Sequence, residues 1–276
     1  MNGVSCGICP HRCNLKEGQT GLCRARSNRG GQIRCDNYGL VTSLALDPIE
    51  KKPLHRFFPG STILSVGSFG CNMHCPFCQN FEISMADIDT SAYTLISPEK
   101  LISQAVSMKS KDNIGVAFTY NEPFVGYEYV YDSSALAHKN GLKTVLVTNG
   151  YVNEEPLLRL LPYIDAMNID LKTFSVDYYR RLGGNLEDVK RTILLSSFTC
   201  HVEVTTLIVP GENDTDEEMR SLSAWLASVD PDIPLHISRF FPRYKMLDRP
   251  ATKTKTVYHL AGIAREALHF VYEGNC

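Results

Sequence analysis

Three cysteines lie close together in one short segment, at Cys71, Cys75 and Cys78, with the spacing C-x3-C-x2-C. Three thiolates so close in sequence can bind one iron–sulfur cluster, and a [4Fe–4S] cluster normally takes four. The missing fourth thiolate leaves one iron open to a non-protein ligand, which is typical of a catalytic metal site. The alternatives are a zinc site that uses His74 as a fourth ligand and a loop of unliganded thiols. Because the segment follows a predicted strand, the spacing favours the cluster.

Four further cysteines lie near the N-terminus, at Cys6, Cys9, Cys13 and Cys23, with the spacing C-x2-C-x3-C-x9-C. Four thiolates can complete a zinc site or ligate an auxiliary iron–sulfur cluster, and the sequence does not choose between them. Four unliganded thiols are the remaining alternative. The surrounding segment has little apolar periodicity, so a metal would help it to fold. We therefore expect a mainly structural metal site, separate from the catalytic cluster.

The composition is that of an ordinary globular protein. The chain has 276 residues, 43% of them hydrophobic, and 28 basic against 30 acidic residues give a net charge of −2. This balance gives no sign of a nucleic-acid or membrane-surface partner. No apolar run reaches the roughly 18 residues that a spanning helix needs, and the first residues do not resemble a secretory signal. We therefore expect a cytoplasmic protein with reduced cysteines.

Short apolar runs alternate with helical patterns from about residue 61 onward. The runs cover residues 62–66, 114–118, 144–147, 166–169, 202–209 and 235–237, and helical patterns cover 98–110, 154–161, 185–197, 215–228 and 254–268. Thr215 and Glu218 have the spacing of a capping box. This alternation predicts an α/β fold with a parallel sheet, either doubly wound or a barrel. Residues 1–60 are predicted to form a cysteine-rich N-terminal module, and residues 61–276 the main body.

Polar residues follow the predicted strands at the position where a barrel enzyme places its catalytic groups. They are Tyr120, Asn121 and Glu122, then Thr148 and Asn149, then Asp170 and Lys172, and finally Arg239. Each segment alone could be a turn or a helix cap, and Asp170 with Lys172 could be a surface ion pair. Their repeated occurrence after successive strands instead favours a shared site at the carboxyl ends of the strands.

The C-x3-C-x2-C loop, with Phe77 before its last cysteine, resembles the signature of the radical S-adenosylmethionine (SAM) superfamily over roughly residues 61–245. The resemblance implies a partial (β/α)6 barrel in which SAM binds the open iron of a [4Fe–4S] cluster. It also implies that one electron, from a reductant such as flavodoxin or ferredoxin, cleaves SAM to a 5′-deoxyadenosyl radical that abstracts hydrogen from the substrate. The cofactors would supply the chemistry and the protein the geometry.

The segments Thr-Tyr-Asn-Glu-Pro, Thr-Asn-Gly and Asp-Leu-Lys, with residues 47–54, are similar to the group of pyruvate formate-lyase activating enzyme, and within it to the radical SAM enzymes of the AmmeMemoRadiSam system. The resemblance implies that Glu122 contacts the amino group of SAM. It also implies that Thr148, Asp170 and Lys172 hold SAM or a monovalent cation. In charge terms, Lys172 suits the SAM carboxylate and Asp170 suits ribose hydroxyls.

Two positions depart from the pattern of these enzymes. Val147 stands where they carry an acidic residue, and Phe241 stands where they carry a histidine near SAM, whereas His236 is kept and could simply pack within its strand. The chain is therefore predicted to be a radical SAM enzyme that acts on a protein or peptide, as a glycyl-radical activating enzyme does. Modification of a small molecule and a zinc-stabilised binding protein are the alternatives.

Overall fold

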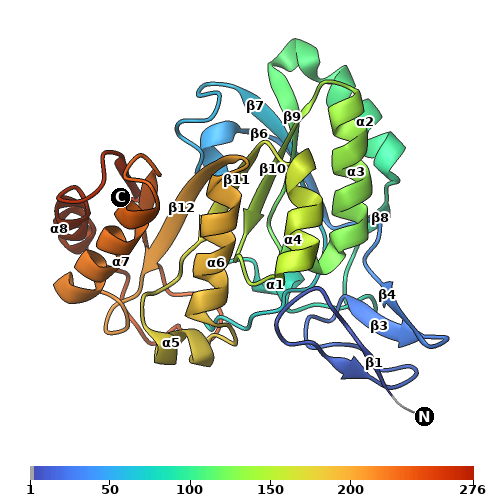
Figure 1. The fold of residues 1–276 in the computed structure, drawn as a ribbon, viewed down its shortest axis with the longest axis horizontal. Helices are drawn as coiled ribbons and strands as arrows, with labels where there is room; N and C mark the ends of the chain where they lie inside the picture. The colour runs from blue at the N-terminus through green and yellow to red at the C-terminus, as the bar shows by residue number, and fades with distance from the viewer. Residues whose placement is uncertain (1–2) are drawn as a thin grey trace.

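The computed structural model describes residues 3–276 and contains one large sheet (Figure 1). Its central strands are parallel and neighbours in chain order: β7 (Thr62–Gly67), β9 (Asn113–Phe118), β10 (Lys143–Thr148), β11 (Ala166–Asp170), β12 (His201–Ile208) and β13 (Leu235–Arg239). β14 (Val271–Gly274) adds in parallel beyond β13, and β6 (Ser43–Pro48) pairs antiparallel with β7. The two edges do not pair with each other. The predicted partial (β/α)6 barrel and its six strands are confirmed.

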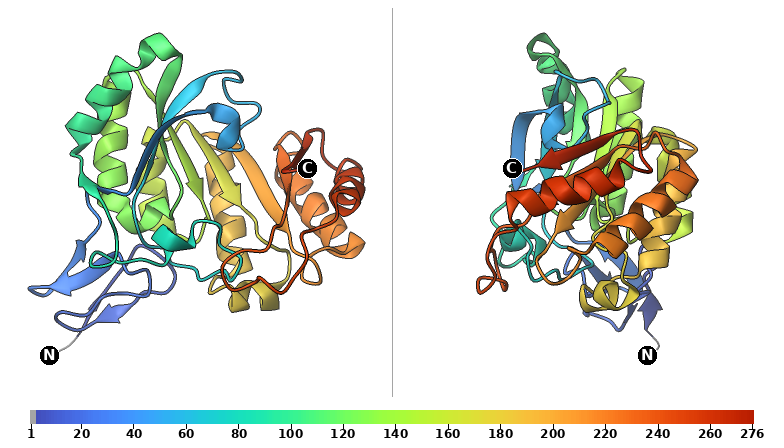
Figure 2. Two further views of the ribbon diagram at one scale, coloured as in Figure 1. Left: turned by 180° about the vertical axis from the view of Figure 1, so that it is seen from behind. Right: turned by 90° about the vertical axis from the view of Figure 1, so that its left-hand side faces the viewer.

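Helices connect the strands and cover the outer face of the sheet (Figures 1 and 2). The longer ones are α2 (Pro98–Ser107), α3 (Tyr127–Lys139), α4 (Glu154–Leu160), α6 (Leu186–Ser197), α7 (Asp216–Val229) and α8 (Thr254–Ala264). Shorter ones are α1 (Phe81–Ser84), α5 (Val176–Arg181), η1 (Ile49–Lys51), η2 (Lys109–Lys111), η3 (Pro123–Gly126) and η4 (Leu161–Tyr163). Helix α7 begins as the capping box predicts, because the Thr215 side chain accepts a hydrogen bond from the Glu218 amide. No helix within residues 3–276 is long and apolar enough to cross a membrane.

Side chains of the central strands alternate between the helices and the inside of the barrel. Those that face the helices form the large core, for example Leu64, Val116, Leu146 and Val204. At the amino-terminal end of the barrel, a small apolar cluster joins Ile63, Ala117, Val145 and Ala166 to residues of the 49–57 segment, namely Ile49, Leu54 and Phe57. This end is therefore filled, and the open cavity of the barrel lies toward the carboxyl ends of the strands.

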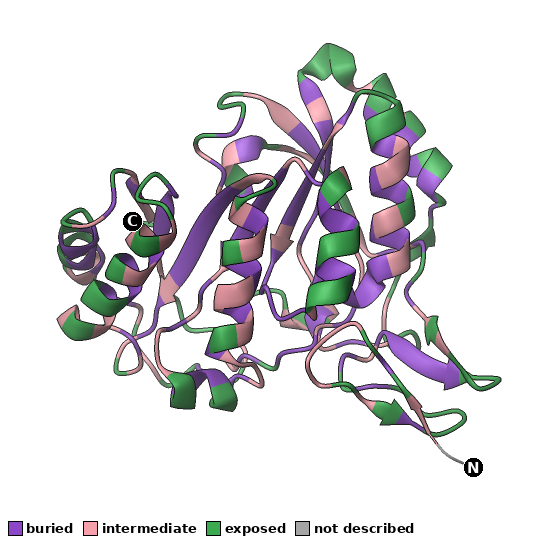
Figure 3. Cartoon of the chain, viewed as in Figure 1, coloured by how far each residue is buried: buried purple, intermediate pink, exposed green. Residues whose placement is uncertain are grey.

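Within residues 3–35, short pairs of antiparallel strands lie below the carboxyl ends of the main strands, at the lower right of Figure 1. β1 (Val4–Ser5) pairs with β2 (Asn14–Leu15), β3 (Arg26–Arg29) with β4 (Gln32–Cys35), and β5 (Leu40–Val41) with β8 (Thr94–Leu95). In the module, buried and exposed residues lie close together (Figure 3). β6 falls inside the range 1–60 but belongs to the main sheet, and a domain division at residue 60 stays a prediction.

Candidate active site

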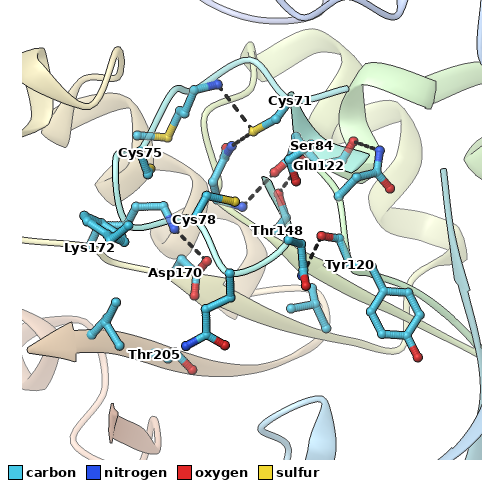
Figure 4. A pocket seen from close by; sticks show the side chains of 18 of the residues that line it. Cys71, Cys75, Cys78, Ser84, Tyr120, Glu122, Thr148, Asp170, Lys172 and Thr205 are labelled. Atoms are coloured by element: carbon cyan, nitrogen blue, oxygen red, sulfur yellow. Dashed lines mark hydrogen bonds and ion pairs between the residues drawn. The ribbon is translucent and has the colours of Figure 1, made fainter. Parts of the chain in front are cut away.

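A cavity of about 280 Å³ opens at the carboxyl ends of the strands, and all three thiols of the C-x3-C-x2-C loop line it (Figure 4). Most of the polar residues that the sequence predicts for this site also line it: Tyr120, Asn121, Glu122, Thr148, Asn149, Asp170 and Lys172, together with Phe77. They come from the ends of three strands, β9, β10 and β11, and from the cysteine loop that follows β7. The fold thus brings together residues that are up to about a hundred positions apart in sequence.

Two asparagines hold the cysteine loop in place. The Asn121 side chain donates to the carbonyl oxygens of Phe69 and Gly70, and its oxygen accepts from the Ser68 amide at 2.9 Å. Asn149 Nδ2 lies 3.6 Å from Cys71 Sγ and donates to Asn72 Oδ1 at 2.9 Å. Both side chains therefore fix the loop, a role that the sequence did not suggest for them.

Glu122 is buried and already has three hydrogen-bond donors. Its Oε1 accepts from the Phe124 amide and from Thr148 Oγ1 at 2.7 Å, and its Oε2 accepts from the Asn149 amide at 2.8 Å. Burial raises the pKa of Glu122 to about 7, against the lowering effect of these donors. Since a carboxylate offers about four acceptor positions, one position remains for a cationic ligand group in the cavity.

Asp170 and Lys172 form an ion pair in the cavity wall, where Lys172 Nζ lies 2.8 Å from Asp170 Oδ2. Burial would lower the pKa of Lys172, but Asp170 and Cys75 together raise it above its ordinary value. Burial raises the pKa of Cys75 to about 11, while the Lys172 charge opposes that rise. The pair is thus a salt bridge that forms part of the cavity wall, and its contact with SAM stays a prediction.

Tyr120 is fixed by the 47–54 segment rather than by its own neighbours in the chain. Its hydroxyl donates to Asp47 Oδ2 at 2.6 Å, and Lys52 Nζ lies 2.8 Å from the same oxygen. The Tyr120 backbone has a φ of 73°, and a Cβ at Gly67 would approach its ring to 2.8 Å. Glycine at position 67 therefore allows Tyr120 to pack against the end of β7.

The cavity is also lined by residues that sequence reasoning missed: Met85, Asn275, Thr205 and Leu207. Thr205 and Leu207 lie on the same face of β12. The alternation of side chains between the two faces of a strand would therefore have predicted that both point into the barrel. Val147, the residue that departs from the acidic position of the similar enzymes, lies in the cavity wall. It contributes no charge there.

Three other residues lie away from this cavity. Arg239 is not among its lining residues; its Nε donates to the Thr252 carbonyl oxygen, and its guanidinium stacks on the Phe241 ring. His236 lies on β13, where its Nε2 is 2.6 Å from Glu203 Oε2. His74, the alternative zinc ligand, packs against Gly183 instead of facing the thiols.

The donor set fits an iron–sulfur cluster better than a single ion. Within residues 3–276, no three His, Cys, Asp or Glu side chains lie close enough to bind one metal ion. A [4Fe–4S] cluster distributes its ligands over several irons, so its thiolates stand further apart than those of one ion. Burial and the charge of Glu122 raise the pKa of Cys71 well above its ordinary value, so metal binding must release a firmly held proton.

The four N-terminal cysteines line a second, smaller cavity together with Ile8, Leu15, Leu22 and Val125. All ten cysteines of the chain are free. Burial raises the pKa of Cys9 to about 12, and the neighbouring thiols Cys23 and Cys6 add to this rise. His11, which also lines this cavity, directs its Nε2 to the Asn72 carbonyl oxygen at 2.8 Å.

Comparison with known proteins identifies the family. The sequence pattern of the Radical SAM superfamily matches residues 65–225, more than half of the chain. The chain belongs to the radical SAM superfamily. It is an enzyme that uses a [4Fe–4S] cluster and SAM, as the cysteine loop indicates.

The chain is similar to two kinds of protein, an uncharacterized protein and several activating enzymes. An uncharacterized protein, MJ0808, of Methanocaldococcus jannaschii is 41% identical over 99% of this chain and 82% of its own length. Pyruvate formate-lyase 1-activating enzyme of Escherichia coli is 28% identical over 55% of this chain and 63% of its own length. The choline trimethylamine-lyase activating enzyme of Oleidesulfovibrio alaskensis is 23% identical over 50% of this chain and 47% of its own length. The chain therefore spans less than two thirds of these activating enzymes and belongs to the group related to them.

Solved structures agree on the fold. SuiB of Streptococcus suis bound to S-adenosylmethionine superposes with a TM-score of 0.60, at 12% identity, over 78% of this chain and 52% of its own. QueE of Escherichia coli superposes with a TM-score of 0.54, at 14% identity, over 85% of this chain and 92% of its own.

Proposed function

We propose that this radical SAM enzyme abstracts hydrogen from a protein or peptide, in the manner of a glycyl-radical activating enzyme. The observation that carries the proposal is the single cavity shared by the three thiols of the cysteine loop, the Asp170–Lys172 ion pair and Glu122. The similarity to enzymes that are named as activating enzymes of other enzymes supports a macromolecular substrate.

The residues of the cavity have complementary roles in this proposal. Cys71, Cys75 and Cys78 would hold the cluster, which with SAM supplies one-electron chemistry for hydrogen abstraction. Lys172 offers its positive charge to a carboxylate group of the ligand. Asp170 keeps one oxygen free to accept a hydrogen bond from a hydroxyl group of the ligand. Glu122 has one remaining acceptor position for an ammonium group. The wall thus presents opposite charges to a zwitterionic ligand.

The rim beside the cysteine loop suits a polypeptide. The Lys245 amide donates to the Pro76 carbonyl oxygen at 2.9 Å, which places the 240–253 loop against the cysteine loop. There the Tyr244 and Phe81 rings stack at 4.7 Å, with the Arg243 guanidinium over Phe81. Arg243 and Lys245 are exposed and pair with no carboxylate of the described residues. Aromatic and cationic side chains are well suited to bind peptide segments.

The test is anaerobic reconstitution with iron, sulfide, reductant and SAM, followed by a screen of candidate proteins and small molecules for faster 5′-deoxyadenosine release. We expect a protein or peptide to accelerate the release, and we expect Cys71→Ala to remove it. Arg243→Ala should raise the polypeptide concentration needed for half-maximal release, while release without substrate stays unchanged. Acceleration by a small molecule alone would refute the proposed substrate class.

A further inference from the structure

The cavity of the four N-terminal cysteines is firmly attached to the main body. Asn153 at the start of α4 donates its side-chain amide to the carbonyl oxygens of Gly7 and Cys9 at 2.7 and 3.0 Å. On the other side, Arg26 is buried and forms a two-point ion pair with Glu128 of α3. The amide of Cys6 donates to the Cys13 carbonyl oxygen, which closes the loop between these two cysteines. The four thiols are thus held at one place relative to the barrel.

That place is directly behind the catalytic cysteine loop, because both neighbours of Cys71 contact the segment that carries the N-terminal cysteines. Gly70 has a φ of 90°, and a Cβ there would stand 2.5 Å from the Cys23 carbonyl oxygen. His11, which lies between Cys9 and Cys13 in the chain, hydrogen-bonds the Asn72 carbonyl oxygen through its Nε2 at 2.8 Å. Asn149 then bridges Asn72 and Cys71. A continuous set of contacts therefore runs from His11, within the N-terminal cysteine segment, through Asn72 and Asn149 to Cys71.

We infer that Cys6, Cys9, Cys13 and Cys23 bind a second iron–sulfur cluster, placed directly behind the loop that binds the catalytic cluster. Besides the four thiols, the cavity wall consists of apolar residues, His11 and Arg26. His11 Nε2 already bonds the Asn72 carbonyl oxygen and Arg26 already pairs with Glu128, so the four sulfurs are the donors assigned to the cluster. The four thiols share two properties with the three thiols of the catalytic loop. Each set lines a single cavity, and within residues 3–276 no three of the side chains lie close enough together to bind one metal ion. A zinc ion needs sulfurs about 2.3 Å from one centre; a cluster takes a wider set.

This cluster differs from the catalytic one in having four protein thiolates. A full set leaves no open iron for SAM, so the second cluster should not respond to SAM. This feature separates the two clusters in a spectroscopic experiment.

The test uses the full-length variant in which Cys71, Cys75 and Cys78 are all replaced by Ala, purified under anaerobic conditions. It leaves the N-terminal residues unchanged, so its outcome does not depend on the folding of an altered module. We expect the variant to keep about a third to a half of the wild-type iron and acid-labile sulfide, according to whether the second cluster has two or four irons. We also expect a reduced-state electron paramagnetic resonance signal that SAM does not change.

Cys200→Ala is the matched control, because Cys200 is partly buried and belongs to neither cavity; it should keep the full iron content. Zinc without iron, iron without sulfide, or no metal in the triple variant would overturn the inference. Equal iron content in the triple variant and the wild type would instead show that the catalytic loop holds no cluster, and would thus count against the proposed function while supporting the second site.

Discussion

Glu203 lies at the inner face of β12, at the end of the barrel opposite the catalytic cavity, and is fully buried at 0% exposure. Four donors converge on its carboxylate. Oε1 accepts from the Arg56 amide and from His201 Nε2, and Oε2 accepts from the His55 amide and from His236 Nε2. The carboxylate thereby ties the 49–57 segment, which closes this end of the barrel, to β12 and β13.

We predict that Glu203→Gln destabilises the fold by about 3 kcal/mol at neutral pH. Burial alone would raise the pKa of Glu203, but the four hydrogen bonds lower it from 4.5 to about 2. At about 1.4 kcal/mol per pH unit, this depression corresponds to about 3 kcal/mol. Each oxygen of Glu203 accepts from one backbone amide, so in either orientation a glutamine would direct its NH2 group at one of them. Two donors would then face each other without an acceptor, which is unfavourable in a buried site.

The assay is urea denaturation of the wild type and the variant between pH 7 and pH 3. Because the folded-state pKa is depressed, the stabilisation is complete above about pH 4.5 and is lost as the pH falls toward 2. The two stabilities should therefore converge at acidic pH. Glu155→Gln, at a side chain that is 82% exposed, is the control and should change stability by less than about 0.5 kcal/mol. An unchanged midpoint for Glu203→Gln, or a stability difference that is independent of pH, would refute the reasoning.

Three predictions concern the two cysteine sites and SAM. Replacing Cys71 by Ala should abolish SAM cleavage and leave the N-terminal metal in place, as metal analysis and 5′-deoxyadenosine assays would show; product from a variant lacking all three loop cysteines would contradict it. Glu122→Gln should weaken SAM binding by about 1.5–3 kcal/mol in calorimetry, the value of a hydrogen bond to a charged group, and equal affinities would disprove the assigned contact. Replacing Cys9 and Cys13 together by Ser should lower the melting temperature or expose the first sixty residues to protease, because metal binding there contributes folding free energy. An N-terminal segment that is equally stable in the double variant would exclude a structural role for the metal.

Much of the fold could be predicted because its signals are local. Each of the six strands is a short apolar run bounded by turn residues, and Thr215 with Glu218 marks the start of α7 within four residues. Helix α3 was missed because tyrosines and small residues make up much of the face that it buries, so its apolar period is weak. Strand β6 was missed because its residues are partly exposed and polar at several positions.

The chemistry of the catalytic site was equally readable from the sequence, because its three thiols lie in one loop whose spacing alone defines a cluster ligand set. What only the tertiary structure decided is which side chains meet there. Asn149 reaches Cys71 from another strand, Arg239 turns away to Thr252, and His11 contacts the residue next to Cys71. These contacts depend on how strands far apart in the chain pair in register and on where the N-terminal hairpins pack. Neither is encoded in the spacing of neighbouring residues, because a side chain's partners across a sheet are set by long-range packing.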